Sequence, residues 1–62
     1  MFKELFELSQ QQKKGLMFYL KGGHQVGGAV TKIVSDDVIE ARNQQYGRII
    51  ILVSSIEAIA MP

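Results

Sequence analysis

The chain lacks cysteine and contains a single histidine, His24, in only 62 residues. A domain of this size buries about 60% of the surface that its unfolded chain exposes, so its own core is marginal. Disulfides, a bound metal or partner subunits usually stabilise such small domains. The absence of cysteine excludes disulfides and thiolate metal sites, and one histidine excludes a multi-histidine site within one chain. Association with other copies is the stabilising device that remains.

Apolar side chains are more frequent than so small an interior can bury. Hydrophobic residues make up 47% of the chain, and six glycines come in addition. We therefore expect part of this apolar surface to be covered by another molecule. The apolar run Ile49–Val53 has the length of a strand and falls far short of the ~20 residues that a membrane helix needs. The composition thus predicts a homo-oligomer that makes no membrane contact.

The N-terminal segment predicts an amphipathic helix over residues 2–12. Phe2, Leu5 and Phe6 share one helical face at i, i+3, i+4 spacing, and Gly15 is a plausible stop. So short a helix must dock on the rest of the domain to be stable. The alternative is a free amphipathic helix that binds a membrane or a partner.

A secretory signal is not expected in the first residues. Glu4 and Glu7 stand where a signal peptide would be basic and then apolar. We therefore expect a cytoplasmic protein.

Five strand-like segments follow the expected helix, separated by turn signals. The pair Gly22–Gly23 favours a tight hairpin turn, and Ser35–Asp37 is a second turn signal. Glycines inside a strand, as at Gly27–Gly28, often mark a bend or a close backbone approach. The expected strands cover residues 16–20, 26–34, 38–43, 48–54 and 56–61.

Strongly bent antiparallel sheets of this size close into small barrels. The sequence therefore predicts one mainly β domain over residues 1–62. It would comprise an N-terminal α-helix at about 2–12 and a five-stranded, strongly bent antiparallel barrel at about 16–61.

The segment Arg48–Ser54 is the most strand-like of the five because it is mostly β-branched. Such a strand on an open sheet edge would promote aggregation. Pairing it head-to-tail with Ile56–Met61 of a neighbouring copy removes that hazard and closes a ring if the rotation permits. The expected subunit interface comprises Ile49, Ile50, Ile51, Leu52, Val53, Ile56 and Ile59.

The polar residues predict no catalytic or metal site. His24 lacks the second histidine or cysteine that a nucleophilic or metal site would need, and it is expected to be a solvated turn residue. Asp36–Asp37 are expected to cap backbone amides in their turn, although a catalytic or metal pair is the alternative. The seven lysines and arginines are scattered apart from Lys13–Lys14, which is typical of a solvated surface. We expect no enzyme activity, no cofactor and no small-molecule substrate.

Two motifs resemble the signatures of the Sm-like family, most of all its bacterial Hfq-type members. They are Tyr19-Leu20-x-x-Gly23-x-x-Val26-x-Gly28-x-Val30 and Ile56-Glu57-Ala58-Ile59. The resemblance implies a helix followed by a bent five-stranded barrel. It also implies rings of about five to seven subunits, in which the fourth strand pairs with the neighbour's fifth. Members of the family usually bind single-stranded RNA on the ring faces or in the pore.

The resemblance also implies an RNA-binding face on the first hairpin. Tyr19, Leu20, Gly23 and Gln25 match positions where Hfq-type rings cradle purine-rich RNA, and His24 lies among them and could contact phosphate or a base. An aromatic ring offers a stacking surface worth ~1–3 kcal/mol per base. The alternative is that Tyr19 is an ordinary strand aromatic at the subunit boundary.

Near the expected pore the sequence departs from the family pattern. Leu52-Val53-Ser54 stands where Hfq has a tyrosine-lysine-histidine run. The remaining pore or loop candidates are Asp36, Asp37 and Ser54.

From the composition and the family resemblance together, we expect a homo-oligomeric ring that binds single-stranded RNA as a chaperone or regulator. The alternative is a structural or protein-interaction ring that has lost RNA binding.

Overall fold

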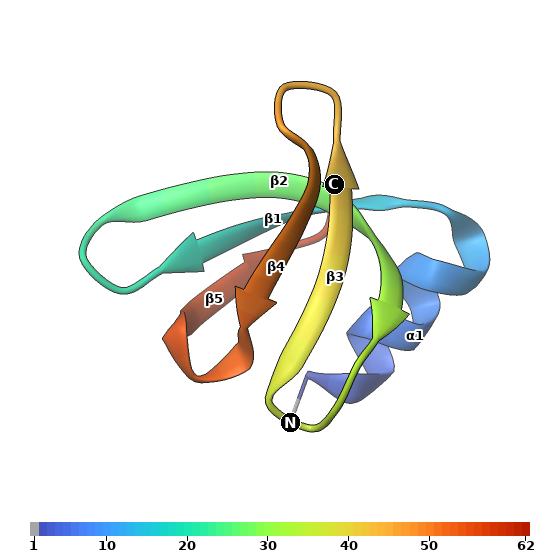
Figure 1. Cartoon of the computed structure of the whole chain (residues 1–62), viewed down its shortest axis with the longest axis horizontal. Helices are drawn as coiled ribbons and strands as arrows, with labels where there is room; N and C mark the ends of the chain where they lie inside the picture. The colour runs from blue at the N-terminus through green and yellow to red at the C-terminus, as the bar shows by residue number, and fades with distance from the viewer. Residues whose placement is uncertain (1) are drawn as a thin grey trace.

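The computed structural model describes residues 2–62 as one helix followed by five strands (Figure 1). This confirms the mainly β class and the N-terminal helix, and every strand lies within two residues of its expected bounds. Among residues 2–62, no helix has the length and apolar character required to span a membrane. The elements are α1 (Lys3–Gln12), β1 (Gly15–Leu20), β2 (His24–Ile33), β3 (Val38–Asn43), β4 (Gly47–Leu52), the 3-10 turn η1 (Val53–Ser55) and β5 (Ile56–Ala60).

The end of α1 differs from the expected stop at Gly15. Lys13 adopts the left-handed conformation, with φ 53°, and its amide donates to the carbonyl of Ser9. The amide of Lys14 donates to the same carbonyl at 3.0 Å. One left-handed residue is enough to reverse the chain, so Gly15 is already the first residue of β1.

The five strands form one antiparallel sheet in the order β4-β3-β2-β1-β5. β2 curves across the molecule (Figure 1), and its register with β3 shifts between Val30 and Lys32. A Cβ atom at Gly28 would lie only 2.8 Å from the carbonyl oxygen of Arg42. The expected close backbone approach at this glycine is therefore confirmed, since a larger residue would push β3 away.

The expected closure into a barrel is wrong for the single chain. β4 and β5 are the two edges of the sheet and are not hydrogen-bonded to each other. The reason lies in η1, which carries the chain from β4 to the far edge, where β5 pairs with β1. Two hydrogen bonds stabilise this connection. The amide of Lys21 donates to the carbonyl of Ser55 at 2.8 Å, and the Ser55 hydroxyl donates to the carbonyl of Leu52 at 2.7 Å.

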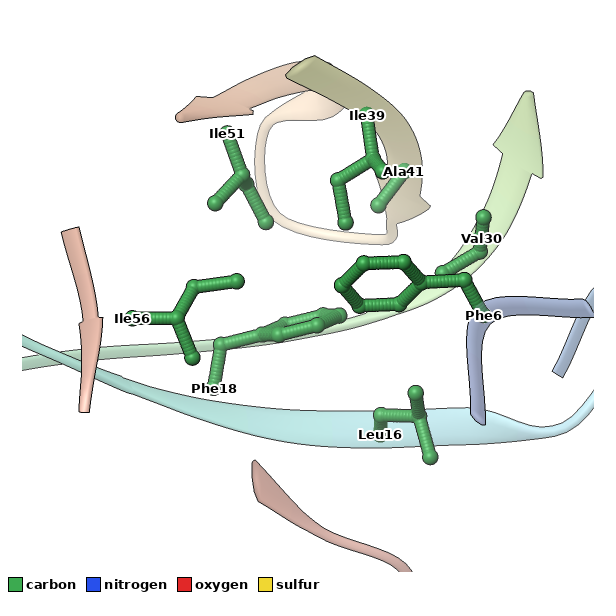
Figure 2. Close-up of a cluster of buried hydrophobic side chains, with 8 residues drawn as sticks. All are labelled: Phe6, Leu16, Phe18, Val30, Ile39, Ala41, Ile51 and Ile56. Carbon is green, nitrogen blue, oxygen red and sulfur yellow. The ribbon is translucent and has the colours of Figure 1, made fainter. Parts of the chain in front are cut away.

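The core lies in the concave side of the sheet and is closed by α1 (Figure 2). Phe18 and Ile39 are fully buried, and the rings of Phe6 and Phe18 lie 6.4 Å apart between centroids. The amphipathic helix is therefore docked on the domain through its apolar face. The buried apolar residues are Phe6, Leu16, Phe18, Val30, Ile39, Ala41, Ile51 and Ile56.

Candidate nucleic-acid interface

Tyr19 lies in a cross-strand row on the convex face of the sheet. It is paired with Gln25 on β2 and with Ala58 on β5. Cross-strand partners share a face, and the preceding residue, Phe18, is fully buried, so the Tyr19 row faces outward. The tyrosine is 40% exposed. The structure thus places an aromatic ring, an amide and a methyl group side by side on an open surface.

The row of residues beside Tyr19 contains small side chains that project little from the sheet. The next row of the same face pairs Met17 with Gly27 and with Ala60. Only Met17 has a long side chain, and its Cε would lie 3.4 Å from a Cβ placed on Gly27. The methionine therefore covers the glycine, and the row forms a shallow floor rather than a wall. A flat base could approach Tyr19 over this floor.

The turn of the β1–β2 hairpin lies next to the Tyr19 row. Gly22 and Gly23 have φ of 84° and 80°, which confirms the expected tight glycine turn. A Cβ on Gly22 would meet the His24 ring at 3.4 Å, so the ring lies over this glycine. His24 is paired with Leu20, one position from Tyr19 and Gln25.

Four of the five expected RNA-binding residues are exposed on this hairpin. They are Tyr19, Gly23, His24 and Gln25, and the hairpin projects on the side of the molecule opposite to α1 (Figure 1). Leu20 differs because it is half-buried and packs against the core. The backbone at Gly23 is open, since a Cβ placed there would meet no other atom within 4 Å.

The expected interface residues divide into two groups. Ile51 and Ile56 belong to the core, and Ile49, Val53 and Ile59 are half-buried against it. Ile50 and Leu52 point outward and are each 57% exposed. β4 therefore offers a partner two apolar side chains and its free backbone edge.

An apolar groove of about 390 Å³ lies along β4. Its floor consists of inward-facing residues of β1, β2 and β4, and Tyr46 from the β3–β4 turn stands beside it. Tyr46 is 65% exposed. The groove is lined by Leu20, Val26, Tyr46, Ile49, Ile50, Ile51, Leu52 and Ser55.

The loop candidates Asp36, Asp37 and Ser54 are all exposed. The sequence predicts that Asp36 and Asp37 cap backbone amides of this turn, but the hydroxyl of Ser35 takes that role. It accepts a hydrogen bond from the Asp37 amide at 3.2 Å. The serine is shorter and reaches the amide two residues on. The carbonyl of Asp37 accepts from the Val53 amide at 2.8 Å, which ties this loop to η1.

A second, smaller hollow lies between the start of α1, the β2–β3 loop and η1. Its volume is about 130 Å³. The hollow is lined by Phe2, Lys3, Phe6, Ile33, Ser35, Asp36 and Val53.

Within residues 2–62, no group of three or more His, Cys, Asp or Glu side chains could hold a metal ion.

Three basic residues that are scattered in the sequence share one surface of the sheet. They are Lys32 on β2, Arg42 on β3 and Arg48 on β4. Arg42 is directly opposite Arg48, and Lys32 is opposite Glu40, so all three lie on the convex face of the sheet. The period-two alternation of β3, in which Ile39 and Ala41 are buried and Arg42 is exposed, is the sequence signal that could have identified this face.

No protein-family model matches the chain, and no match was found among curated proteins or among solved structures. Function is therefore inferred from the exposed surfaces of the sheet and from its free edges.

Proposed function

We propose that the chain is a subunit of a homo-oligomeric ring that binds single-stranded RNA, as an RNA chaperone or regulator. The observation that carries the proposal is the exposed Tyr19 ring in a row with Gln25 and Ala58. The tyrosine offers a stacking surface for a base. The amide of Gln25 supplies two donors and an acceptor for the edge of that base.

The free edges of the sheet support the assembly part of the proposal. β4 and β5 each have one backbone edge without a strand partner in the sheet. β4 also exposes Ile50 and Leu52, and an apolar edge of this kind invites aggregation unless it is covered. β5 of a second copy lying along β4 would satisfy both edges. Repetition of this head-to-tail contact gives the ring of about five to seven subunits that the Sm-like resemblance implies.

A ring would multiply the contribution of each shallow site. One base on one tyrosine is a weak contact, but linked sites on neighbouring subunits bind one strand with an effective concentration that raises the overall affinity. Oligonucleotides long enough to reach several subunits should therefore bind much more tightly than short ones.

The binding site is tested by titrating fluorescently labelled A-rich and U-rich oligonucleotides at low and moderate salt. We expect wild-type protein to bind, and Tyr19→Ala to weaken binding at least about 5-fold, since one stacked base is worth ~1–3 kcal/mol. Tyr19→Phe is the matched control, because it keeps the aromatic ring and loses only the hydroxyl. Light scattering on each variant shows whether the oligomer is intact. Absence of binding to either oligonucleotide at low salt, with the oligomer intact, would contradict the proposal.

A second candidate is a ring that binds protein and no RNA. It is favoured by the apolar residues exposed near one end of β4, Leu52 and Ile50, and by Val34 in the adjoining loop, which is 52% exposed. The same titration separates the two candidates, because this ring would stay oligomeric and leave both oligonucleotides free.

A further inference from the structure

Three of the seven lysines and arginines form a patch on the convex face of β2, β3 and β4, which we call the basic patch: Lys32, Arg42 and Arg48. Arg42 and Arg48 are direct cross-strand partners. Lys32 is paired with Glu40 in the neighbouring row. Since Ala41, between Glu40 and Arg42, is fully buried, all four charged side chains point away from the core.

The direct pairing of Arg42 with Arg48 is electrostatically unfavourable in the isolated chain. Like charges opposite each other in an antiparallel sheet are destabilising. Glu40 is the only carboxylate on β2, β3 and β4. Its Oε1 lies 3.5 Å from Nε of Arg48, and its Oε2 accepts from the Thr31 hydroxyl at 2.8 Å. One carboxylate is thus set against three cations.

Lys32 and Arg42 are the two cations of the basic patch that this arrangement leaves without a salt bridge. Within residues 2–62, the Arg48–Glu40 contact is the one salt bridge of the structure, so Arg42 has no acidic partner there. A planar guanidinium is well suited to phosphate, which it can bind through two parallel hydrogen bonds. A phosphate over the patch would turn the repulsion between the two arginines into a shared attraction.

β2 links the basic patch to the Tyr19 row. The outward-facing residues of β2 between the two are Gly27 and Ala29, with Gln25 in the Tyr19 row and Ala29 paired with Arg42. At ~3.3 Å per residue, the step from Gln25 to Ala29 covers about 13 Å of strand. β2 itself places no long side chain in this path, and the Met17 side chain of β1, which lies over Gly27, forms its floor.

We propose that the basic patch binds the phosphate backbone of the RNA strand whose bases stack at the Tyr19 row. The inference rests on the proposed function and adds a second, chemically different contact to it. The Tyr19 row binds bases and the basic patch binds phosphates, so the two surfaces contribute differently to the salt dependence of binding.

The test is the salt dependence of binding of a single-stranded oligonucleotide to wild type, Arg42→Ala and Arg42→Ala/Arg48→Ala between about 50 and 200 mM salt. For single strands, each phosphate contact contributes about −0.7 to the slope of log K against log salt. We expect the slope to become less steep by about 0.7 in the single variant and further in the double variant. Lys14→Ala, which removes one exposed cation at the end of α1, should keep the wild-type slope.

Two further measurements separate a binding role from a structural one. The thermal midpoint of Arg42→Ala should not fall, because the substitution relieves a like-charge contact, and Arg42→Lys should retain most of the slope. Tyr19→Ala should weaken binding without changing the slope.

The two ways in which the proposal can fail are distinguishable. Wild-type binding with a slope that is the same in Lys14→Ala and in the double arginine variant would overturn the basic patch alone, and would fit a surface for an acidic protein instead. No wild-type binding at low salt would overturn the proposed function and the basic patch together.

Discussion

At the scale of single residues, Ser9 joins three parts of the fold. It is fully buried, and its hydroxyl accepts from the Val30 amide at 3.1 Å and donates to the Lys14 carbonyl at 2.5 Å. It therefore connects α1 to the bend in β2 and to the start of β1. Polar groups buried in this way are stabilising only while every partner is present.

The substitution Ser9→Ala should be strongly destabilising for so small a change. It leaves the buried Val30 amide without a partner, and an unsatisfied buried group costs ~1–3 kcal/mol. It also removes the part-buried hydrogen bond to the Lys14 carbonyl. We expect the free energy of unfolding in urea, at fixed chain concentration, to fall by about 1–3 kcal/mol. Ser54→Ala is the control, since Ser54 is exposed, and equal stability of the two variants would contradict this role of Ser9.

Ser9 also shows a limit of prediction from sequence. A serine followed by three glutamines is typical of a polar helix end, so nothing in the pattern indicates burial. Its role depends on where β2 passes, which is a tertiary feature. Tyr19 and Gln25, by contrast, could be predicted, because a tight glycine turn between two strands brings them opposite each other.

At the scale of secondary-structure elements, the C-terminus of α1 carries a local conformational cost. Lys13 is the only non-glycine residue with positive φ among residues 2–62. The left-handed conformation costs a residue with a side chain ~1–2 kcal/mol. Glycine adopts it freely, although it loses more chain entropy on folding.

Lys13→Gly should therefore stabilise the protein by about 0.5–1 kcal/mol. Thermal unfolding followed by circular dichroism would show it as a higher midpoint. Lys14→Gly is the matched control, because Lys14 does not have positive φ and gains nothing from glycine. If the thermal midpoint changed equally in both variants, the left-handed conformation of Lys13 would carry no conformational cost.

The strands could be predicted from the sequence, but the way they assemble could not. Periodicity and turn residues are local signals, and they place each strand within two residues. Register is not local, since a slip of one residue moves every side chain to the other face. The shift between Val30 and Lys32 has no sequence signature, and it decides that Lys32 joins Arg42 and Arg48. The open sheet, in place of the expected barrel, likewise depends on the path of η1.

At the scale of the whole molecule, the single chain leaves two edges of its sheet and an apolar groove uncovered. The groove lies along β4, one of the two unpaired edges, and among residues 2–62 the core has only eight buried apolar residues. One neighbour on β4 and one on β5 would cover these features. The same contacts would bring the Tyr19 rows of several subunits within reach of one RNA strand.

The exposed side chains of β4 allow the proposed subunit interface to be tested without damage to the core. Ile50→Lys adds a charge where the side chain is 57% exposed in the single chain, and Gln11→Lys is a control at an exposed position of α1. We expect Ile50→Lys to lower the oligomer mass while the circular dichroism spectrum is kept, and Gln11→Lys to leave the mass unchanged.

The molar mass of the purified protein in solution tests the central claim most directly. Light scattering at micromolar concentration should give about five to seven times the chain mass, which is 6.9 kDa. A stable, soluble species with the mass of one chain would contradict the ring and everything inferred from it.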